Sequence, residues 1–422
     1  MAEYKRKKIK KSFFHKKKSS VVETNIPMTD KKSKATGIIH EKKIKVVRGN
    51  KQQRLQFAKV LIIAIAIVSL SLVILSVSLP VGLYENLVNL SASIGPGSFP
   101  LSISGSDIIN THTNGSYYYV LSDSNITAYS NSGKIIIDEF HGFANPIMSV
   151  SDTRVLVYDQ GGKQAYVYNL GGKIHTLETK KEIITASISK DGFIAVSTQS
   201  GQSATVTVYN KNLKQIFSWY SADSIINNAL VNNSGKKLAV TTLGVKSGQY
   251  ESKLLIFNIK TESADPVHTE NFGSSIVLSI ENTGSGVSAI CNDKYKFIHW
   301  KKFTGNEVTA TGEINLYRNT KNGILLVFNR ANNRTDNTII LISKSGKKTA
   351  EFNLQSSITD IQYNKGRVYH LSDTTINIFN KNGEKLRSGN CEYGVQKFSV
   401  ISAYTIAAIS DNQITKTTID KE

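Results

Sequence analysis

The sequence contains only two cysteines, Cys291 and Cys391, which lie one hundred residues apart. A fold held together by disulfides would use more of them. Two cysteines also cannot complete a zinc site without nearby histidines, and the eight histidines are scattered with no His-x-x-x-His pair. We expect the cysteines to act as two separate small apolar residues, with a single bridge between them as the alternative.

Short catalytic motifs are also missing. There is no His-Glu-x-x-His, no P-loop, no Gly-x-Ser-x-Gly and no EF-hand aspartate series. Six aspartates fall in predicted turns, where such side chains commonly cap their own backbone. They are Asp123, Asp152, Asp191, Asp293, Asp373 and Asp411. An acid–base pair formed by distant turns stays open, but the sequence predicts no catalytic, cofactor-binding or metal-binding residue.

No lysine or arginine occurs between Lys59 and Lys134. Within this gap residues 60–79 are uncharged and apolar, and twenty helical residues cover the roughly 30 Å hydrocarbon core of a bilayer. Upstream, residues 1–59 hold 19 basic and 4 acidic residues. Because basic flanks stay on the cytoplasmic side, we predict a single span at 60–79 in the plasma membrane. The N-terminus is then cytoplasmic and the C-terminal region extracytoplasmic; a cleaved signal peptide is the alternative, although its apolar core is usually shorter.

Residues 1–59 form a basic tail that is predicted to be mostly disordered, because few large apolar residues separate its lysine clusters. The positive charge of the tail can serve only to keep it on the cytoplasmic side, or the tail can also contact anionic lipid head groups. We expect no nucleic-acid partner, since residues 60–422 carry 33 basic and 28 acidic side chains, and no nucleic-acid-binding module accompanies the tail. Residues 80–98 are predicted as a linker or stalk. They combine a short helix, suggested by Leu83, Leu87 and Leu90, with a Gly95-Pro96-Gly97 breaker.

From residue 99 onward the pattern is one of short strands and no ordinary amphipathic helix. Strict alternation in residues 203–209, where Ala204, Val206 and Val208 share one face, predicts a half-buried strand. Continuous apolar runs at 254–257, 324–328 and 339–342 are typical of strands covered on both faces. Turns rich in Gly and Asn recur about every 42 residues between Gly133 and Gly383. That period is typical of four-stranded propeller blades.

The units also resemble one another. The phrase GSYYYVLSDSNITAYSNSGKII from Gly115 parallels GRVYHLSDTTINIFNKNGEKL from Gly366, and ASISKDGFIAVST from Ala186 parallels ALVNNSGKKLAVTT from Ala229. These phrases resemble the repeats of WD40-, TolB- and quinoprotein-like β-propellers, although the Trp-Asp dipeptide is absent and the only tryptophans are Trp219 and Trp300. The layout also resembles single-pass propeller proteins of clostridial-type Gram-positive bacteria. That resemblance implies a fold and brings no assigned activity.

We therefore predict an all-β propeller over residues 99–422. Eight blades are favoured and seven are the alternative, with units starting near Asp107, Asn145, Glu182, Asp223, Ser275, Ile314, Ser357 and Val395. The last unit has room for only three strands, so residues 99–104 are expected to add its outer strand and close the ring. Tyr117, Tyr118 and Tyr119 are expected to divide between the two faces of one strand. An exposed Trp219-Tyr220 pair would mark a partner contact, and packing in the core is the alternative.

These observations predict a non-enzymatic binding or scaffold module at the outer face of the membrane, with a protein or an envelope polymer as its partner. Function on such a ring resides in its loops, so the fold alone does not decide it. The alternative is an extracytoplasmic enzyme, a hydrolase or a quinone- or metal-dependent oxidoreductase, with its site in the central channel. Clustered carboxylates or histidines there would favour the enzyme.

Overall fold

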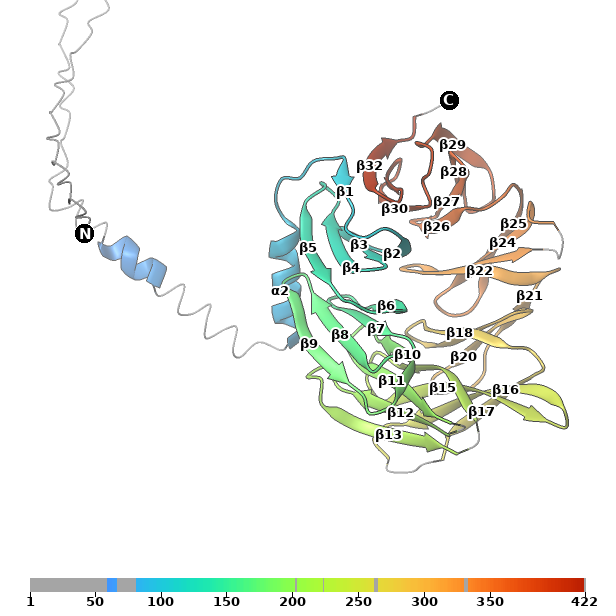
Figure 1. The fold of residues 1–422 in the computed structure, drawn as a ribbon. Coiled ribbons are helices and arrows are strands. Elements are labelled where there is room, and N and C mark those ends of the chain that lie inside the picture. Colours follow the sequence, from blue (N-terminus) through green and yellow to red (C-terminus); the bar gives the residue numbers. More distant parts are fainter. Residues whose placement is uncertain are drawn as a thin grey trace, which may run out of the picture. The chain divides into compact units, whose positions relative to one another are not determined.

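The computed structural model describes residues 59–66, 81–201, 203–222, 224–261, 265–329 and 333–420. The strands of these residues form eight four-stranded antiparallel sheets. The sheets are arranged as the blades of a ring (Figure 1). Their first strands begin within three residues of the eight unit starts predicted from the sequence. The prediction of an eight-bladed propeller is therefore confirmed, and the seven-bladed alternative is wrong.

The first strand of each blade is the innermost, because first strands of neighbouring blades contact one another around the ring axis. Blades 1 and 2 consist of β2 (Ile108–Asn114), β3 (Tyr117–Ser122), β4 (Asn125–Ser130), β5 (Ile135–Phe140), and β6 (Pro146–Val150), β7 (Val155–Asp159), β8 (Gln164–Asn169), β9 (Gly172–Glu178). Blades 3 and 4 consist of β10 (Glu182–Ile188), β11 (Ile194–Ser200), β12 (Ser203–Tyr209), β13 (Gln215–Ser221), and β14 (Ile225–Val231), β15 (Lys237–Lys246), β16 (Gln249–Asn258), β17 (His268–Gly273).

The second half of the ring repeats this order. Blades 5 and 6 consist of β18 (Val277–Asn282), β19 (Gly286–Cys291), β20 (Lys294–His299), β21 (Glu307–Thr309), and β22 (Glu313–Thr320), β23 (Gly323–Asn329), β24 (Asp336–Ser343), β25 (Lys348–Gln355). Blades 7 and 8 consist of β26 (Asp360–Asn364), β27 (Arg367–Ser372), β28 (Thr375–Asn380), β29 (Lys385–Asn390), and β30 (Lys397–Ser402), β31 (Thr405–Ile409), β32 (Gln413–Thr418), β1 (Leu101–Ser102).

The ring closes by pairing its two ends. β1 lies antiparallel to β32, with Leu101 opposite Ile414 and Ser102 opposite Gln413, and so supplies the outer strand of blade 8. This is the closure predicted for residues 99–104. Pairing the two ends of the ring in one blade closes the ring and gives blade 8 its fourth strand.

The core consists of apolar layers between neighbouring blades. On β12 the buried residues are Ala204, Val206 and Val208, as the alternating pattern predicts. On β3, Tyr117 and Tyr119 pack into the cluster shared with blade 2, whereas Tyr118 packs into the cluster shared with blade 8. The predicted division of this tyrosine triplet between the two faces of one strand is confirmed.

The two cysteines are free thiols, with Cys291 buried and Cys391 half-buried, so the prediction of separate residues is confirmed. Trp219 packs against Phe257, with ring centroids 4.8 Å apart, and joins the core between blades 3 and 4. Tyr220 beside it is 59% exposed. Of this pair, only Tyr220 therefore remains a candidate for a partner contact.

One further helix, α2 (Val81–Ser93), precedes the ring, where the sequence predicts a short helix. Of the predicted span, residues 60–66 are helical; residues 67–79 and the basic tail up to residue 58 lie outside the described residues. In the part of the chain that the structure describes, no helix is both long and apolar enough to cross a membrane.

Candidate functional site

A buried polar site lies where α2 meets the ring. The helix runs beside β5 and β9, the outer strands of blades 1 and 2 (Figure 1). Its inner face carries Glu85, Val88, Asn89 and Ala92, which follow the i, i+3, i+4, i+7 spacing of one helix face. Glu85 and Asn89 are 5% and 6% exposed, whereas Leu87 and Leu90 on the opposite face are 51% and 60% exposed. The helix thus docks through its polar side.

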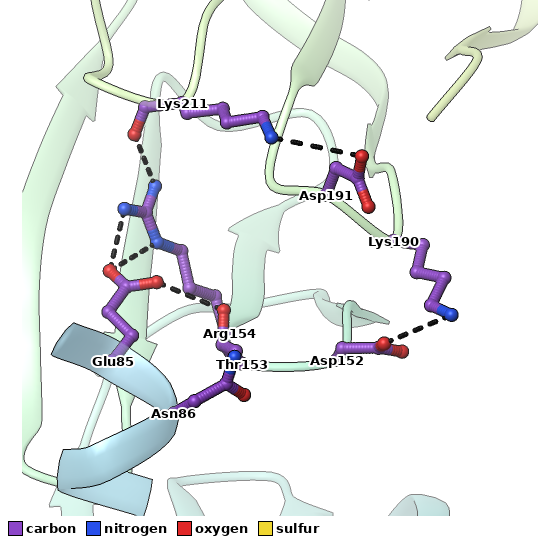
Figure 2. Close-up of a pocket in the computed structure, with 8 residues that line it drawn as sticks. All are labelled: Glu85, Asn86, Asp152, Thr153, Arg154, Lys190, Asp191 and Lys211. Atoms are coloured by element: carbon purple, nitrogen blue, oxygen red, sulfur yellow. Dashed lines mark hydrogen bonds and ion pairs between the residues drawn. The ribbon is translucent and has the colours of Figure 1, made fainter. Parts of the chain in front are cut away.

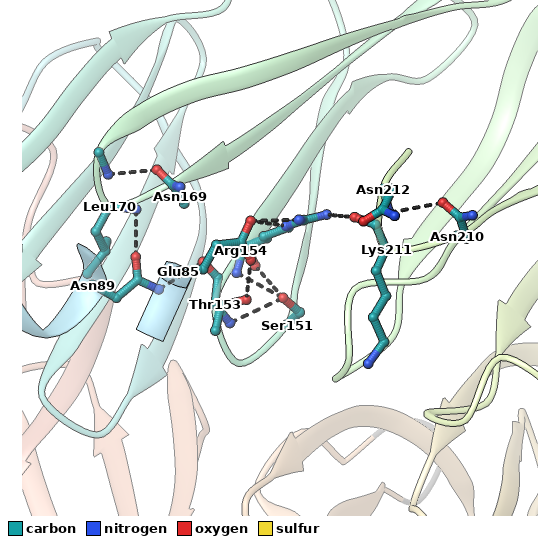
Figure 3. Close-up of polar contacts among 11 residues, drawn as sticks. Glu85, Asn89, Ser151, Thr153, Arg154, Asn169, Leu170, Asn210, Lys211 and Asn212 are labelled. Carbon is teal, nitrogen blue, oxygen red and sulfur yellow. Dashed lines mark hydrogen bonds and ion pairs between the residues drawn. The ribbon is translucent and has the colours of Figure 1, made fainter. Parts of the chain in front are cut away.

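The side-chain amide of Asn89 both donates and accepts a hydrogen bond. Its Nδ2 donates to the carbonyl oxygen of Thr153 at 2.9 Å, and its Oδ1 accepts from the amide of Leu170 at 3.0 Å. Thr153 lies in the β6–β7 turn and Leu170 in the β8–β9 turn, so one side chain ties the helix to two turns of blade 2 (Figure 3). Because both backbone groups are buried there, each would otherwise lack a partner.

Glu85 forms the second tie, one helical turn earlier. Its Oε1 lies 2.6 Å from Arg154 Nη2 and accepts from Arg154 Nε at 2.7 Å, while its Oε2 accepts from Thr153 Oγ1 at 2.9 Å (Figure 2). The two charged side chains are only 6% and 4% exposed. A buried ion pair compensates its desolvation only when geometry is good and its remaining atoms are hydrogen-bonded, and both conditions hold here.

Arg154 extends this connection to blade 3. Its Nη1 donates to the carbonyl oxygen of Lys211 at 2.7 Å, in the turn between β12 and β13. Local turn chemistry holds both partners in place (Figure 3). Ser151 Oγ accepts from the amide of Arg154 at 2.9 Å, and Asn210 Oδ1 accepts from the amide of Asn212 at 2.9 Å. One guanidinium therefore joins α2, blade 2 and blade 3.

A small pocket of about 170 Å³ opens beside this ion pair (Figure 2). Its rim carries two partly exposed pairs, Lys190 with Asp152 at 3.3 Å and Lys211 with Asp191 at 3.7 Å. Two of the six turn aspartates are thus brought to one site. Each lies beside a lysine, so the rim combines both signs of charge and favours neither an anion nor a cation.

Three of the other four turn aspartates bond to the segment that precedes the first strand of their own blade. Asp123 accepts from the amide and hydroxyl of Ser106 at 2.9 and 2.8 Å, and the hydroxyl hydrogen bond lowers its pKa. Asp293 accepts from Ser275 Oγ, Asp411 accepts from Gln396, and Asp373 occupies a turn with φ of +49°. These contacts join separate segments of one blade, whereas the sequence predicts aspartates that cap their own turns.

The inner strands hold a few titratable groups around the ring axis. On β18, burial raises the pKa of Glu281 to about 7, and Asn319 of β22 donates to its Oε2 at 2.7 Å. On β2, burial lowers the pKa of His112 to about 4, which leaves the imidazole neutral at pH 7. Arg318 of β22 and the buried Asp360 of β26 are paired at 2.8 Å. Among the residues that the structure describes, no three His, Cys, Asp or Glu side chains gather as a metal site.

A sequence model of a protein family of unknown function, DUF5711, matches residues 102–419. The chain belongs to the DUF5711 family. The matched region comprises nearly the whole ring of this DUF5711 protein and begins after α2. The search of curated proteins found no match to the sequence.

Solved structures show what the DUF5711 ring is similar to. The C-terminal WD40 domain of Sif2 is 13% identical, with a TM-score of 0.52, over 77% of this chain and 100% of that chain. The dihydro-heme d1 dehydrogenase NirN is 11% identical, with a TM-score of 0.50, over 76% and 78%. BamB from Moraxella catarrhalis is also 11% identical, at 0.49, over 76% and 99%. At such identities the likenesses to Sif2 and NirN show the propeller fold alone.

Sequence reasoning missed Glu85, Asn89 and Arg154 as a unit. A signal was present, since Glu85 is the only charged residue between positions 60 and 106 and Asn89 lies four residues later on the same helix face. Their distant partner, Arg154, could not be identified, because 69 residues separate it from Glu85 and only the ring brings it close.

Proposed function

We propose that this DUF5711 protein is a non-enzymatic binding or scaffold module, anchored in the plasma membrane by residues 60–79 and displaying its ring on the extracytoplasmic side. Its partner there is a protein or an envelope polymer. The basic tail is proposed to contact anionic lipid head groups on the inner side. A tail peptide that ignores anionic vesicles at physiological salt would refute the lipid contact.

The observation that supports this proposal most is the docking of α2, the helix that follows the predicted anchor in the sequence, on the ring. α2 begins at Val81, directly after the predicted span and Pro80, and is held to blades 2 and 3 by a buried ion pair and a two-ended amide. A flexible tether would need no such contacts. A connection that sets the position of a rigid ring above the membrane suits a module that presents its loops to a partner.

Topology is tested by fusing reporters after residue 422 of the full chain. An exported reporter such as alkaline phosphatase should be active there, and a reporter that works only in the cytoplasm should be silent. The matched control deletes residues 60–79 and should reverse both results. Activity of the cytoplasmic reporter on the intact chain would refute the proposed orientation.

Binding is tested by placing a photo-reactive amino acid at exposed positions of the full chain in intact cells. Tyr393, in the loop before β30, is 94% exposed, and Tyr220 at the end of β13 is 59% exposed. The buried Tyr118 provides a matched negative control. We expect a defined adduct with an envelope component from at least one exposed position. Adducts equally abundant from Tyr118, or none from any exposed loop, would count against a binding module.

One observation favours the enzymatic alternative, a hydrolase or a quinone- or metal-dependent oxidoreductase. A carboxyl whose pKa is raised to about 7, as in Glu281, can exchange protons near neutral pH, as a general acid or base must. Turnover of any substrate from a panel of these classes that disappears in Glu281→Gln, with the fold retained, would favour the enzyme over the scaffold.

A further inference from the structure

We infer that the outer face of α2 lies on the lipid surface of the outer leaflet, so that the ring meets the membrane by its rim at blades 1 and 2. This inference rests on the proposed anchoring and deepens it, because it names the surface that α2 contacts and fixes which edge of the ring faces the bilayer.

The chemistry of that face suits a lipid interface. Leu87 and Leu90 on α2 and Ile94 just after it are 51%, 60% and 65% exposed, and Tyr84 at the side of the helix is 46% exposed. The uncharged Asn86 and Ser91 flank them. No charge interrupts them, because the only charged residue of the segment, Glu85, is turned inward to Arg154. A helix with an apolar outer face and an interfacial tyrosine is typical of segments that lie in the head-group region.

The helix cannot relieve this exposure by rotation. Turning the leucines toward the ring would expose Glu85 and Asn89 and leave Arg154, the Thr153 carbonyl and the Leu170 amide without their partners. A buried charge without its partner is strongly destabilising. The polar contacts therefore fix the apolar face outward.

The strands beside α2 continue the apolar surface. Ile135 on β5 is 48% exposed and Ile174 on β9 is 39% exposed. Lys134, next to Ile135, donates from Nζ to the carbonyl oxygens of Ala92 and Ile94, both at 2.9 Å. That contact holds the start of β5 against the end of the helix.

The chain length between span and helix identifies lipid as the occupant. Only Pro80 separates the predicted end of the span, Leu79, from the first residue of α2. Two residue steps reach at most about 7 Å. The head-group layer on each side of the hydrocarbon core is about 5–8 Å thick. The helix therefore starts within or at the edge of that layer, which makes lipid the surface nearest to its first turns.

The test uses the full chain in phosphatidylcholine vesicles. A polarity-sensitive fluorophore is attached at Leu90→Cys in a Cys391→Ser background, with Cys291 left in place because it is buried. Tyr393→Cys is the matched control, since Tyr393 is exposed in the loop between β29 and β30 and remote from α2 in sequence. Nitroxide-labelled lipid should quench the Leu90→Cys probe several-fold more than the control, and aqueous iodide should show the reverse order.

Equal quenching at both positions would overturn the inference. Self-quenching that grows with the protein-to-lipid ratio, without nitroxide quenching, would also overturn it and would assign the face to a second copy. Leu87→Cys repeats the test if Leu90→Cys lowers the melting temperature. Vesicle flotation separates the two proposals: a chain that floats without lipid quenching refutes only the docked face, whereas a chain that does not float refutes the anchor.

Discussion

Arg154 in the β6–β7 turn and Glu85 on α2 form an ion pair at 2.6 Å with side chains only 4% and 6% exposed. The pair joins a helix outside the propeller repeat to the ring itself. It is buried at the β6–β7 turn of blade 2, and Arg154 also donates to the Lys211 carbonyl oxygen of blade 3. Since both carboxylate oxygens of Glu85 are bonded to this turn, we expect the pair to contribute mainly to the docking of α2.

Replacing the arginine is predicted to release the helix. In Arg154→Met, Glu85 stays buried without a counter-charge, which costs about 3–5 kcal/mol. Because α2 contributes no strand to any blade, the ring should remain folded while the helix undocks. Hydrogen exchange should show faster exchange of the amides in residues 85–93, with little change in β7 and β8.

The matched control removes both charges together. Glu85→Leu with Arg154→Met should dock again, since replacing a whole buried pair by apolar residues is often neutral. If the double variant exchanges as fast as the single variant, the pair does not hold the helix by its charges. Unfolding of the whole ring in Arg154→Met would equally contradict the prediction.

The same helix shows what sequence patterns can predict. Alternation on β12, turn residues such as Gly133 and Gly383, and the 42-residue period are local, so they predict eight blades and their boundaries. Leu87 and Leu90 suggest a helix, and a helix is present, but their side chains face outward. An apolar stripe normally marks the buried face. Here the distant Arg154 and the Leu170 amide determine the buried face, and local periodicity carries no information about them.

Two tyrosines are predicted to respond oppositely to loss of the hydroxyl. Tyr168 is fully buried and its hydroxyl has no hydrogen-bond partner among the residues described, so Tyr168→Phe should raise the free energy of unfolding by about 1 kcal/mol. Tyr129 donates to the carbonyl oxygen of Ser102 in the closing strand β1 at 3.4 Å, so Tyr129→Phe should lower it by about 0.5–1.5 kcal/mol. Denaturant unfolding measures both, and a shift of the same sign in both variants would contradict the assignment.

The inner strands are predicted to make stability depend on pH through Glu281. Its folded-state pKa of about 7 lies above the ordinary value of 4.5, so the folded protein binds more protons between these two values. The contribution of this group is therefore most favourable below pH 4.5 and is lost as the pH rises through 7. Glu281→Gln should remove this contribution to the pH dependence of stability. It should also raise the melting temperature at pH 8 relative to the parent protein.

His112 provides a control of opposite sign. Its pKa is lowered from 6.5 to about 4, so the unfolded chain binds more protons in that range and stability is lost as the pH falls through it. His112→Gln should therefore reduce the loss of melting temperature on acidification from pH 6.5 to 4. If Glu281→Gln and His112→Gln change the pH dependence of the melting temperature in the same direction, burial of these two groups does not control that dependence.

The β26–β27 turn is predicted to gain stability from a single substitution at Lys365. This residue has φ of +47° and is followed by Gly366 at +79°, between the paired residues Asn364 and Arg367. Two successive positive φ values define the tight hairpin turn that favours Asn-Gly, and a left-handed conformation costs an ordinary L-residue roughly 1–2 kcal/mol. Lys365→Asn should therefore raise the free energy of unfolding by about 0.5–1 kcal/mol, because Asn tolerates this region better. Lys365→Val should lower the free energy of unfolding, because a β-branched side chain is least suited to positive φ. If denaturant unfolding finds Lys365→Val more stable than Lys365→Asn, the turn geometry is refuted.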